Sequence, residues 1–416
     1  MLENQESFVR NSAVKAALFT VPQRLHHTDS QVYPITKRRF VKYMYRKQCQ
    51  YIDKVAVCVM ICLENNDKTR IITMETQKQH TTSGITPAAK RVLWSGILFS
   101  LAFTALIWWA GQWLDRSSFL PDQGASWYYW KLPNPTLWTR LTAWGFYVAH
   151  QLAMWGLIYY AQTRVKRYTG GLHKVNWIAL GVNAFFIVLH FVQTHIWYDG
   201  LAQDVSIWSS QGSVILMLVM ILIMENRRRG LFWGKRGPIS RDATSFVRKY
   251  HGYVFAWATV YTFWYHPAES TLGHLVGFFY MFLLLLQGSL FYTRLHINRW
   301  WMGVQEVMVL FHGTLVAVMQ GNGLWPMFFF GFGGMFVITQ MHGLRLPNWS
   351  KWVILAAYVG GVIITYSGLG WVRINEIVRI PIIEYLAALL LAGLITLGLR
   401  IFKRKPIVQE AEGVTA

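Results

Sequence analysis

Charged side chains are scarce in this chain of 416 residues. They make up 14% of it, against about 25% in an ordinary soluble domain, while 54% of the residues are hydrophobic. Acidic residues are the scarcer class, with 19 Asp and Glu against 40 Lys and Arg. A soluble globular domain is therefore excluded. Nucleic acid is also not indicated as a partner, because from residue 74 onward the basic residues fall in short clusters between long apolar runs.

Cysteine is almost absent, with Cys49, Cys58 and Cys62 near the start of the chain and none beyond them. This excludes disulfides and thiolate metal sites from the apolar body. The sequence also contains neither the GxxxxGK[ST] motif of nucleotide hydrolases nor the HExxH motif of zinc proteases. The chemistry of the chain must therefore rest on other residue types.

Long apolar runs dominate the remainder of the chain. A helix needs roughly 20 apolar residues to cross a bilayer, and ten windows of about this length are present: 92–113, 137–162, 176–198, 206–225, 250–267, 271–292, 301–320, 324–342, 352–371 and 380–402. They lack the alternation typical of membrane strands, and a bilayer admits only helices or closed barrels. We therefore expect an all-α, polytopic integral membrane helical bundle of about ten transmembrane helices.

The basic residues predict the orientation of these helices. From residue 74 on, 23 Lys and Arg lie in the lead, every second loop and the tail, and only five lie in the loops between. Because cytoplasmic loops carry the excess of Lys and Arg, both termini are expected on the inside. Eight of the 23 occupy the segment 225–249, which we interpret as a topology determinant in contact with lipid headgroups.

The chain divides into four predicted regions. Residues 1–73 form a polar, basic extension, interpreted either as a cytoplasmic tail that lies on anionic lipid or as a misassigned start before Met74. Residues 74–91 form a cytoplasmic lead, 92–402 the transmembrane domain and 403–416 a cytoplasmic tail. The extension lacks the layout of a cleavable signal peptide. We expect a multi-pass protein of an inner or plasma membrane, with the lipid bilayer as its first partner.

Histidine is concentrated inside the predicted membrane domain. Ten of the 13 His lie between residues 150 and 342, and an ionisable side chain at membrane depth indicates function by default. Their depth in the membrane follows from the rise of about 1.5 Å per helical residue. By depth, nine of them divide into a deep group, an outer group with two nearby acids, and an inner group. The deep group is His150, His190 and His312; the outer group is His195, His266 and His274 with Asp199 and Glu269; the inner group is His251, His296 and His342.

The deep group adjoins the outer group, so the histidines form two tiers, one outer and one inner. Two tiers suit b-type haem, which takes two axial imidazoles from neighbouring helices at one depth. His251 and His266 lie about 22 Å apart along one helix. Their candidate partners are His296 or His342 on the inside, and His195 or His274 on the outside. This layout resembles transmembrane b-type cytochromes and ferric-reductase-like membrane domains, which place paired His on two helices. It departs from them because the regular spacing of His is not repeated on a second helix. His296 and His312 lie in a loop and in a helix instead of sharing one helix.

A non-haem metal ion is the alternative cofactor. Its candidate ligands are the outer and deep residues His190, His195, His266, His274, Asp199 and Glu269. His190 and His195 are five residues apart, which places them about 140° from each other on an ideal helix, so they would chelate one ion only with distortion. Each histidine also has a structural alternative, in which a neutral ring is hydrogen-bonded inside the bundle.

Glu306 is the deepest acid in the predicted spans, and with His312 it is a candidate to carry protons. The leading hypothesis is a His-rich membrane redox or electron-transfer protein with b-type haem between the second and eighth spans. If the chain is an enzyme, this hypothesis makes it a membrane oxidoreductase. Its partner would be a membrane electron donor or a quinone-like small molecule. The alternatives are a proton-coupled transporter without a cofactor, and a metal-dependent membrane enzyme that acts on a lipid-soluble substrate.

Overall fold

The structure is a computed structural model that describes residues 84–114, 119–120, 130–321 and 323–402. The basic extension 1–73 and the tail 403–416 lie outside these residues. The described part contains ten α-helices and no β-strand apart from two isolated bridges. The helices are α3 (Pro87–Ala110), α4 (Leu137–Arg164), α5 (Lys174–Ile196), α6 (Ile207–Arg229), α7 (Arg241–Phe263), α8 (Leu272–Ser289), α9 (Arg299–Met319), α10 (Trp325–Ile338), α11 (Asn348–Leu369) and α12 (Glu376–Ile401).

Seven helical segments of the described part are long and apolar enough to cross a membrane. They contain α3, α5, α6, α8, α9, α11 and α12. Helices α4 and α7 have the length but not the composition, and α10 has only 14 residues. Each of the ten predicted windows holds one helix, and the helical membrane bundle is confirmed. The seven segments do not establish a count of ten spans or the orientation.

Many large apolar side chains on the outer faces of the helices are exposed. On α3, for example, Trp94 is 68% and Leu98 67% exposed, and on α12 Leu390 is 67% exposed. Exposure of such a surface to water is unfavourable, whereas the hydrocarbon region of a bilayer solvates it well. These faces are consistent with contact with lipid.

Side-chain caps fix where several helices begin. Ser240 accepts a hydrogen bond from the backbone N–H of Ala243 and so starts α7, and Asn298 does the same for the first turn of α9. At the other end, Gly230 has φ of +80° and terminates α6 directly after Arg229. These ends determine which side chains of each helix lie within the bundle.

Helix α8 occupies the centre of one half of the bundle, in contact with α3, α5, α7 and α9. Helix α4 packs against α5 and α7 beside it. In the other half, α10 contacts α9, α11 and α12, while α6 joins the halves through α7 and α12.

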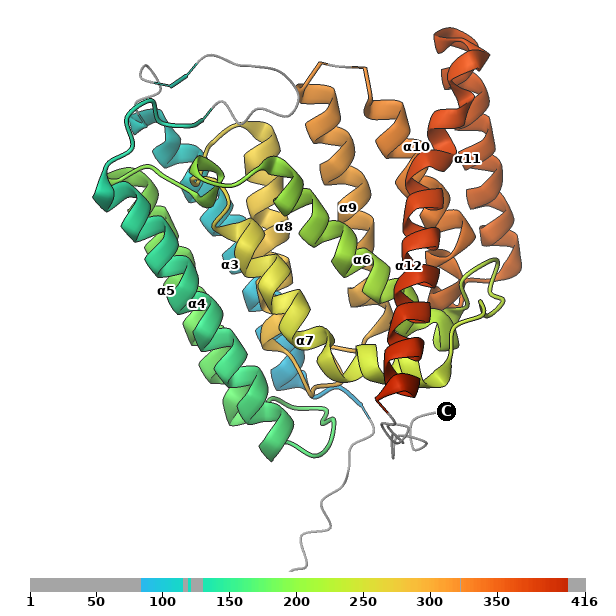
Figure 1. Cartoon of the computed structure of the whole chain (residues 1–416), viewed down its shortest axis with the longest axis horizontal. Coiled ribbons are helices and arrows are strands. Elements are labelled where there is room, and N and C mark those ends of the chain that lie inside the picture. Colours follow the sequence, from blue (N-terminus) through green and yellow to red (C-terminus); the bar gives the residue numbers. More distant parts are fainter. Residues whose placement is uncertain (1–83, 115–118, 121–129, 322, 403–416) are drawn as a thin grey trace, which may run out of the picture. The chain divides into compact units, whose positions relative to one another are not determined.

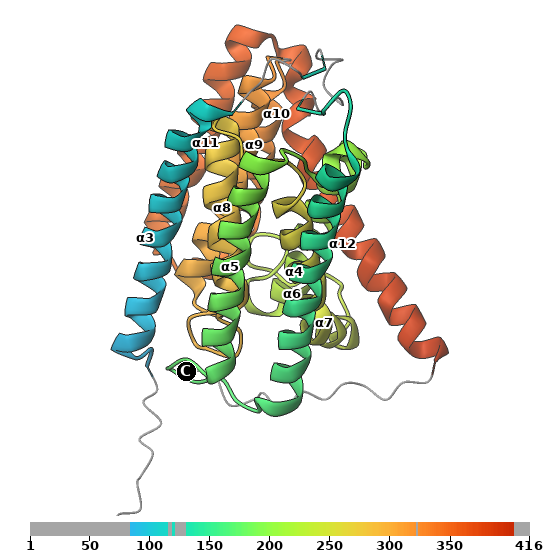
Figure 2. The ribbon, with the colours of Figure 1, turned by 90° about the vertical axis from the view of Figure 1, so that its left-hand side faces the viewer.

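Figure 1 shows α4 and α5 at one side of the bundle and α11 and α12 at the other, and Figure 2 shows the bundle from the side of α3, α4 and α5. The largest apolar core surrounds Trp264 and Phe278, next to the histidines.

Candidate functional site

The inner histidines form one close pair. His251 lies near the middle of α7, and His296 lies in the connection between α8 and α9. Their ring centroids are 6.3 Å apart, with an angle of 35° between the planes. His342, the other inner partner considered, instead packs edge-on against Trp233 at 6.2 Å. The structure therefore brings His251 together with His296.

Both rings of this pair are held by backbone carbonyls. His251 Nδ1 donates to the carbonyl of Arg248 at 2.7 Å, and His296 Nδ1 donates to that of Gln287 at 3.0 Å. Because a carbonyl only accepts, each Nδ1 carries the proton and each Nε2 has the lone pair that binds a metal. Burial lowers the pKa of His296, in the loop, to about 4, so this ring is neutral at pH 7.

The outer histidines are also close together, in a different geometry. The ring centroids of His266 and His274 are 4.5 Å apart and nearly perpendicular. Phe278 packs beside them, with its centroid 5.2 Å from His266 and 5.6 Å from His190. His312 reaches the same region from α9, where its Nε2 is 2.8 Å from the position of a Cβ on Gly277. Glycine at 277 thus allows His312 to approach α8.

The hydrogen bonds of the outer group differ from ring to ring. His266 Nδ1 donates to the carbonyl of Pro267 at 3.2 Å, and His274 Nδ1 lies 2.7 Å from the hydroxyl of Thr271. The Nε2 atoms of His195 and of the deep residue His190 are buried and find no hydrogen-bond partner in the described part of the chain. His195 Nδ1 donates to the carbonyl of Phe191 within its own helix.

The two outer acids are turned to other partners. Glu269 accepts a hydrogen bond from the Tyr198 hydroxyl at 2.6 Å, and Asp199 accepts one from the backbone N–H of Gly200 at 2.8 Å. Burial raises the pKa of Asp199, in the loop after α5, to about 6. Within residues 84–402 as described, three or more His, Cys, Asp or Glu residues are nowhere grouped so as to hold a metal ion. The six candidate metal ligands are therefore not assembled.

His150 has a different environment from all of these. Its Nδ1 accepts from the indole N–H of Trp264 at 3.2 Å, and its Nε2 donates to the side-chain oxygen of Asn183 at 2.8 Å. The amide nitrogen of Asn183 in turn donates to the Leu285 carbonyl and to the Ser289 hydroxyl. Both ring nitrogens are in use, so His150 could bind a metal only by breaking a hydrogen bond. Its geometry fits the structural alternative.

Glu306 and His312 have different neighbours. Glu306 accepts a hydrogen bond from Arg229 at 2.6 Å in a buried ion pair, whereas the nearest aromatic partner of His312 is Tyr280, with ring centroids 6.4 Å apart. Arg229 was expected at the headgroups but is only 4% exposed. That expectation was wrong for this residue, because α6 continues to Arg229 and carries its side chain into the bundle.

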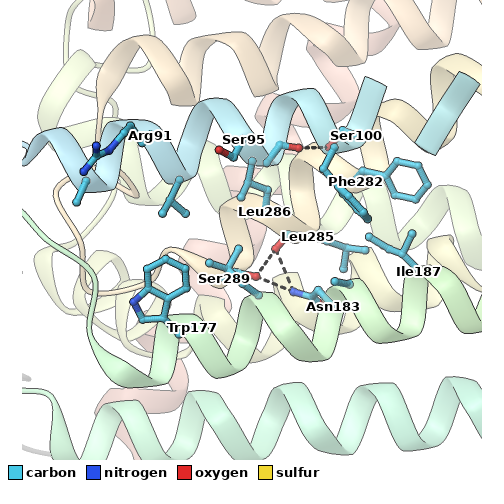
Figure 3. A pocket seen from close by; sticks show the side chains of 16 residues that line it. Arg91, Ser95, Ser100, Trp177, Asn183, Ile187, Phe282, Leu285, Leu286 and Ser289 are labelled. Carbon is cyan, nitrogen blue, oxygen red and sulfur yellow. Dashed lines mark hydrogen bonds between the residues drawn. The ribbon is translucent and has the colours of Figure 1, made fainter. Parts of the chain in front are cut away.

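An apolar groove of about 470 Å³ lies between α3, α5 and α8. Figure 3 shows Arg91 and Trp177 toward one end of it and the bonds of Asn183 to Ser289 and Leu285 along its wall. The polar atoms of Asn183 are thus already used by its neighbours. The groove offers a mainly apolar surface to a lipid or to another membrane-soluble molecule.

The sequence pattern predicts Asn183 as a donor within the bundle but does not predict its partners, and it assigns no role inside the bundle to Arg229 or Trp264. Asn183 is a polar residue near the middle of an apolar window, and such a residue needs a partner inside the bundle. Arg229 directly precedes a glycine at the end of an apolar helix. Comparison with protein-family models, with curated proteins and with solved structures gave no match.

Proposed function

We propose that this chain is a membrane electron-transfer protein that binds b-type haem through His251 and His296. A membrane electron donor or a quinone-like small molecule is the partner that such a function requires. When bound, a haem supplies one-electron chemistry, and the chain controls its potential through the axial ligands and their burial. The residues of this chain would hold the iron from two sides and keep the cofactor away from water.

The observation that carries the proposal is the spacing of the two rings. A bond from a metal ion to an imidazole nitrogen is about 2 Å long, so two imidazoles on opposite sides of one ion have centres roughly 6 Å apart. His251 and His296 have centroids 6.3 Å apart. They come from α7 and from the connection before α9, so two different elements would hold the iron.

The fixed protonation of the two rings also supports it. A ligating histidine usually donates its second ring N–H to a carbonyl or carboxylate, which sets both the tautomer and the orientation of the ring. His251 and His296 each donate Nδ1–H to a backbone carbonyl. The outer pair differs, because the centroids of His266 and His274 are only 4.5 Å apart. The proposal therefore rests on the inner pair.

Ten spans with both termini inside is the topology that accompanies this function. In this proposal helices α4, α7 and α10 would supply the three spans beyond the seven apolar segments, and the packing of each of them against those segments supports this count. The division of Lys and Arg, 23 against five, supports the orientation and a location in an inner or plasma membrane. His251 and His296 would then lie toward the cytoplasmic side.

An absorption spectrum of the purified full chain tests the proposal. We expect a Soret band that shifts on reduction by dithionite, with sharp α and β bands of a six-coordinate haem. His251→Ala and His296→Ala should each lose these bands. His342→Ala is the matched control and should keep them, because its ring packs against Trp233 and not in the pair. A featureless spectrum after supply of haem during expression would refute the proposal.

A further inference from the structure

Arg229 is a buried arginine with an incompletely used guanidinium group. It is the last residue of α6, and its side chain is 3% exposed. Its Nη1 donates to Glu306 Oε2 at 2.6 Å, and the Glu306 side chain is 5% exposed. The stem is tightly packed, since a Cβ on Gly343 would lie 3.2 Å from both Cβ and Cδ of Arg229. The position of the guanidinium is therefore well fixed.

The remaining edge of this group has no partner within the described chain. Nε and Nη2 of Arg229 are both buried, and neither donates a hydrogen bond to any described residue. Native proteins pair nearly all buried polar groups with protein, water or an ion, so these two adjacent donors require an acceptor from outside the described residues. These donors form the planar fork that binds the two oxygens of a carboxylate in parallel.

A second polar side chain lies on the same turn of α9. Gln305 directly precedes Glu306 and is 6% exposed. Its amide nitrogen and its amide oxygen are both buried without a hydrogen-bond partner in the described part.

The charges around the fork favour an anionic ligand over a neutral one. Glu306 compensates Arg229, and Glu225 forms an ion pair with Arg228. Arg248 interacts electrostatically with Glu225, Arg227 and Arg228. The region thus holds two acids and four arginines, so an added anion lowers its net charge. The residues are Arg227, Arg228, Arg229, Arg248, Glu225 and Glu306.

We propose that Arg229 binds a carboxylate group of a ligand at a buried site between α6 and α9. Glu306 orients the guanidinium through Nη1 and leaves the edge formed by Nε and Nη2 to the ligand. The carboxylate has two possible sources: a free small carboxylate from the cytoplasmic side, or the carboxylate arm of a bound cofactor. Only the second source rests on the proposed function, because b-type haem carries such arms.

Thermal unfolding of the purified full chain tests the free source. Sodium acetate is compared with sodium chloride at equal ionic strength, for the native chain, for Arg229→Lys and for Arg227→Lys. Lysine keeps the charge but lacks the fork. Arg227 is exposed and serves as the matched control. We expect acetate to raise the Tm of the native chain and of Arg227→Lys by about 2 °C, and to leave that of Arg229→Lys unchanged.

Mass spectrometry of small molecules extracted from the same samples tests the bound source. We expect any carboxylate-bearing compound held at this site to accompany the native chain and Arg227→Lys but not Arg229→Lys. Either the acetate effect or this compound supports the site. If both are missing, the fork is solvated by water alone and the proposal is wrong. An acetate effect without haem bands would refute the proposed function and leave the site intact.

Glu306→Gln provides a second test if Arg229→Lys does not fold. Glutamine can still accept from Nη1 of Arg229, but the charge of the guanidinium is then uncompensated. A carboxylate ligand should therefore stabilise Glu306→Gln more than the native chain, with a larger rise in Tm in acetate. An equal or smaller rise would contradict binding at Arg229.

Discussion

The hydrogen bond between His150 and Asn183 offers a direct test of the buried polar network. We predict that Asn183→Leu destabilises the chain by about 2–3 kcal/mol, the cost of a buried donor without an acceptor. His150 is 0% exposed, so water does not replace the lost acceptor. The proton cannot move to Nδ1, because that atom accepts from Trp264, whose indole N–H only donates.

A double substitution separates this cause from a simple change in packing. In the double variant Asn183→Leu with His150→Leu, both partners are apolar, and removing both partners costs less than leaving one unpaired. We therefore expect the loss of stability in the double variant to be smaller than the sum of the two single losses by at least about 1 kcal/mol. The unsatisfied imidazole, and not the altered volume, would then account for the loss.

Thermal unfolding in detergent, followed by tryptophan fluorescence, measures these differences. A change of 1 kcal/mol corresponds to about 2 °C in a large domain, so Asn183→Leu should lower Tm by about 4–6 °C. Ser289→Ala is the milder comparison, since the Asn183 amide still donates to Leu285. Strictly additive single effects, or an unchanged Tm for Asn183→Leu, would refute the reasoning.

Two further predictions concern the loop after α5. A Cβ on Gly200 would lie 2.7 Å from the carbonyl oxygen of Tyr265, so Gly200→Ala should cost about 2–3 kcal/mol in stability, whereas Gly181→Ala, which meets nothing within 4 Å, should cost nothing. Burial raises the pKa of Asp199 from 3.8 to about 6, so the stability it contributes is present below about pH 4 and is lost as the pH rises through about 6. The Tm of the native chain should fall over this range relative to that of Asp199→Asn, and parallel curves for the two would contradict the assignment.

The positions of the helices were predictable because the apolar runs are long and uninterrupted. Their ends were less so, because caps and turns decide them. Helix α7 begins at Arg241, nine residues before the predicted window, since Ser240 caps it. Helix α10 ends at Ile338, four residues before the end of its predicted window, and a short 3-10 segment, Gln340–Leu344, follows. Hydropathy does not register either feature.

The depth of a histidine followed from its place in a helix, but its partner did not. His251 and His296 lie at the same end of the bundle, and depth alone made them candidates for a pair. Depth also grouped His150 with the functional candidates, although its ring is bonded to Asn183 and Trp264. Which side chains meet depends on the rotation and tilt of each helix. These are set by packing among several helices and cannot be derived from one apolar run.

Arg229 shows how a charge at the end of a span can acquire a role inside the bundle. Three consecutive arginines end α6, and two of them, Arg227 and Arg228, are exposed. A helix turns by about 100° per residue, so three consecutive residues cannot all face the headgroups. One of them must face the neighbouring helices, and there it needs an acid. Glu306 of α9 is that acid, and the two positions are therefore best interpreted together.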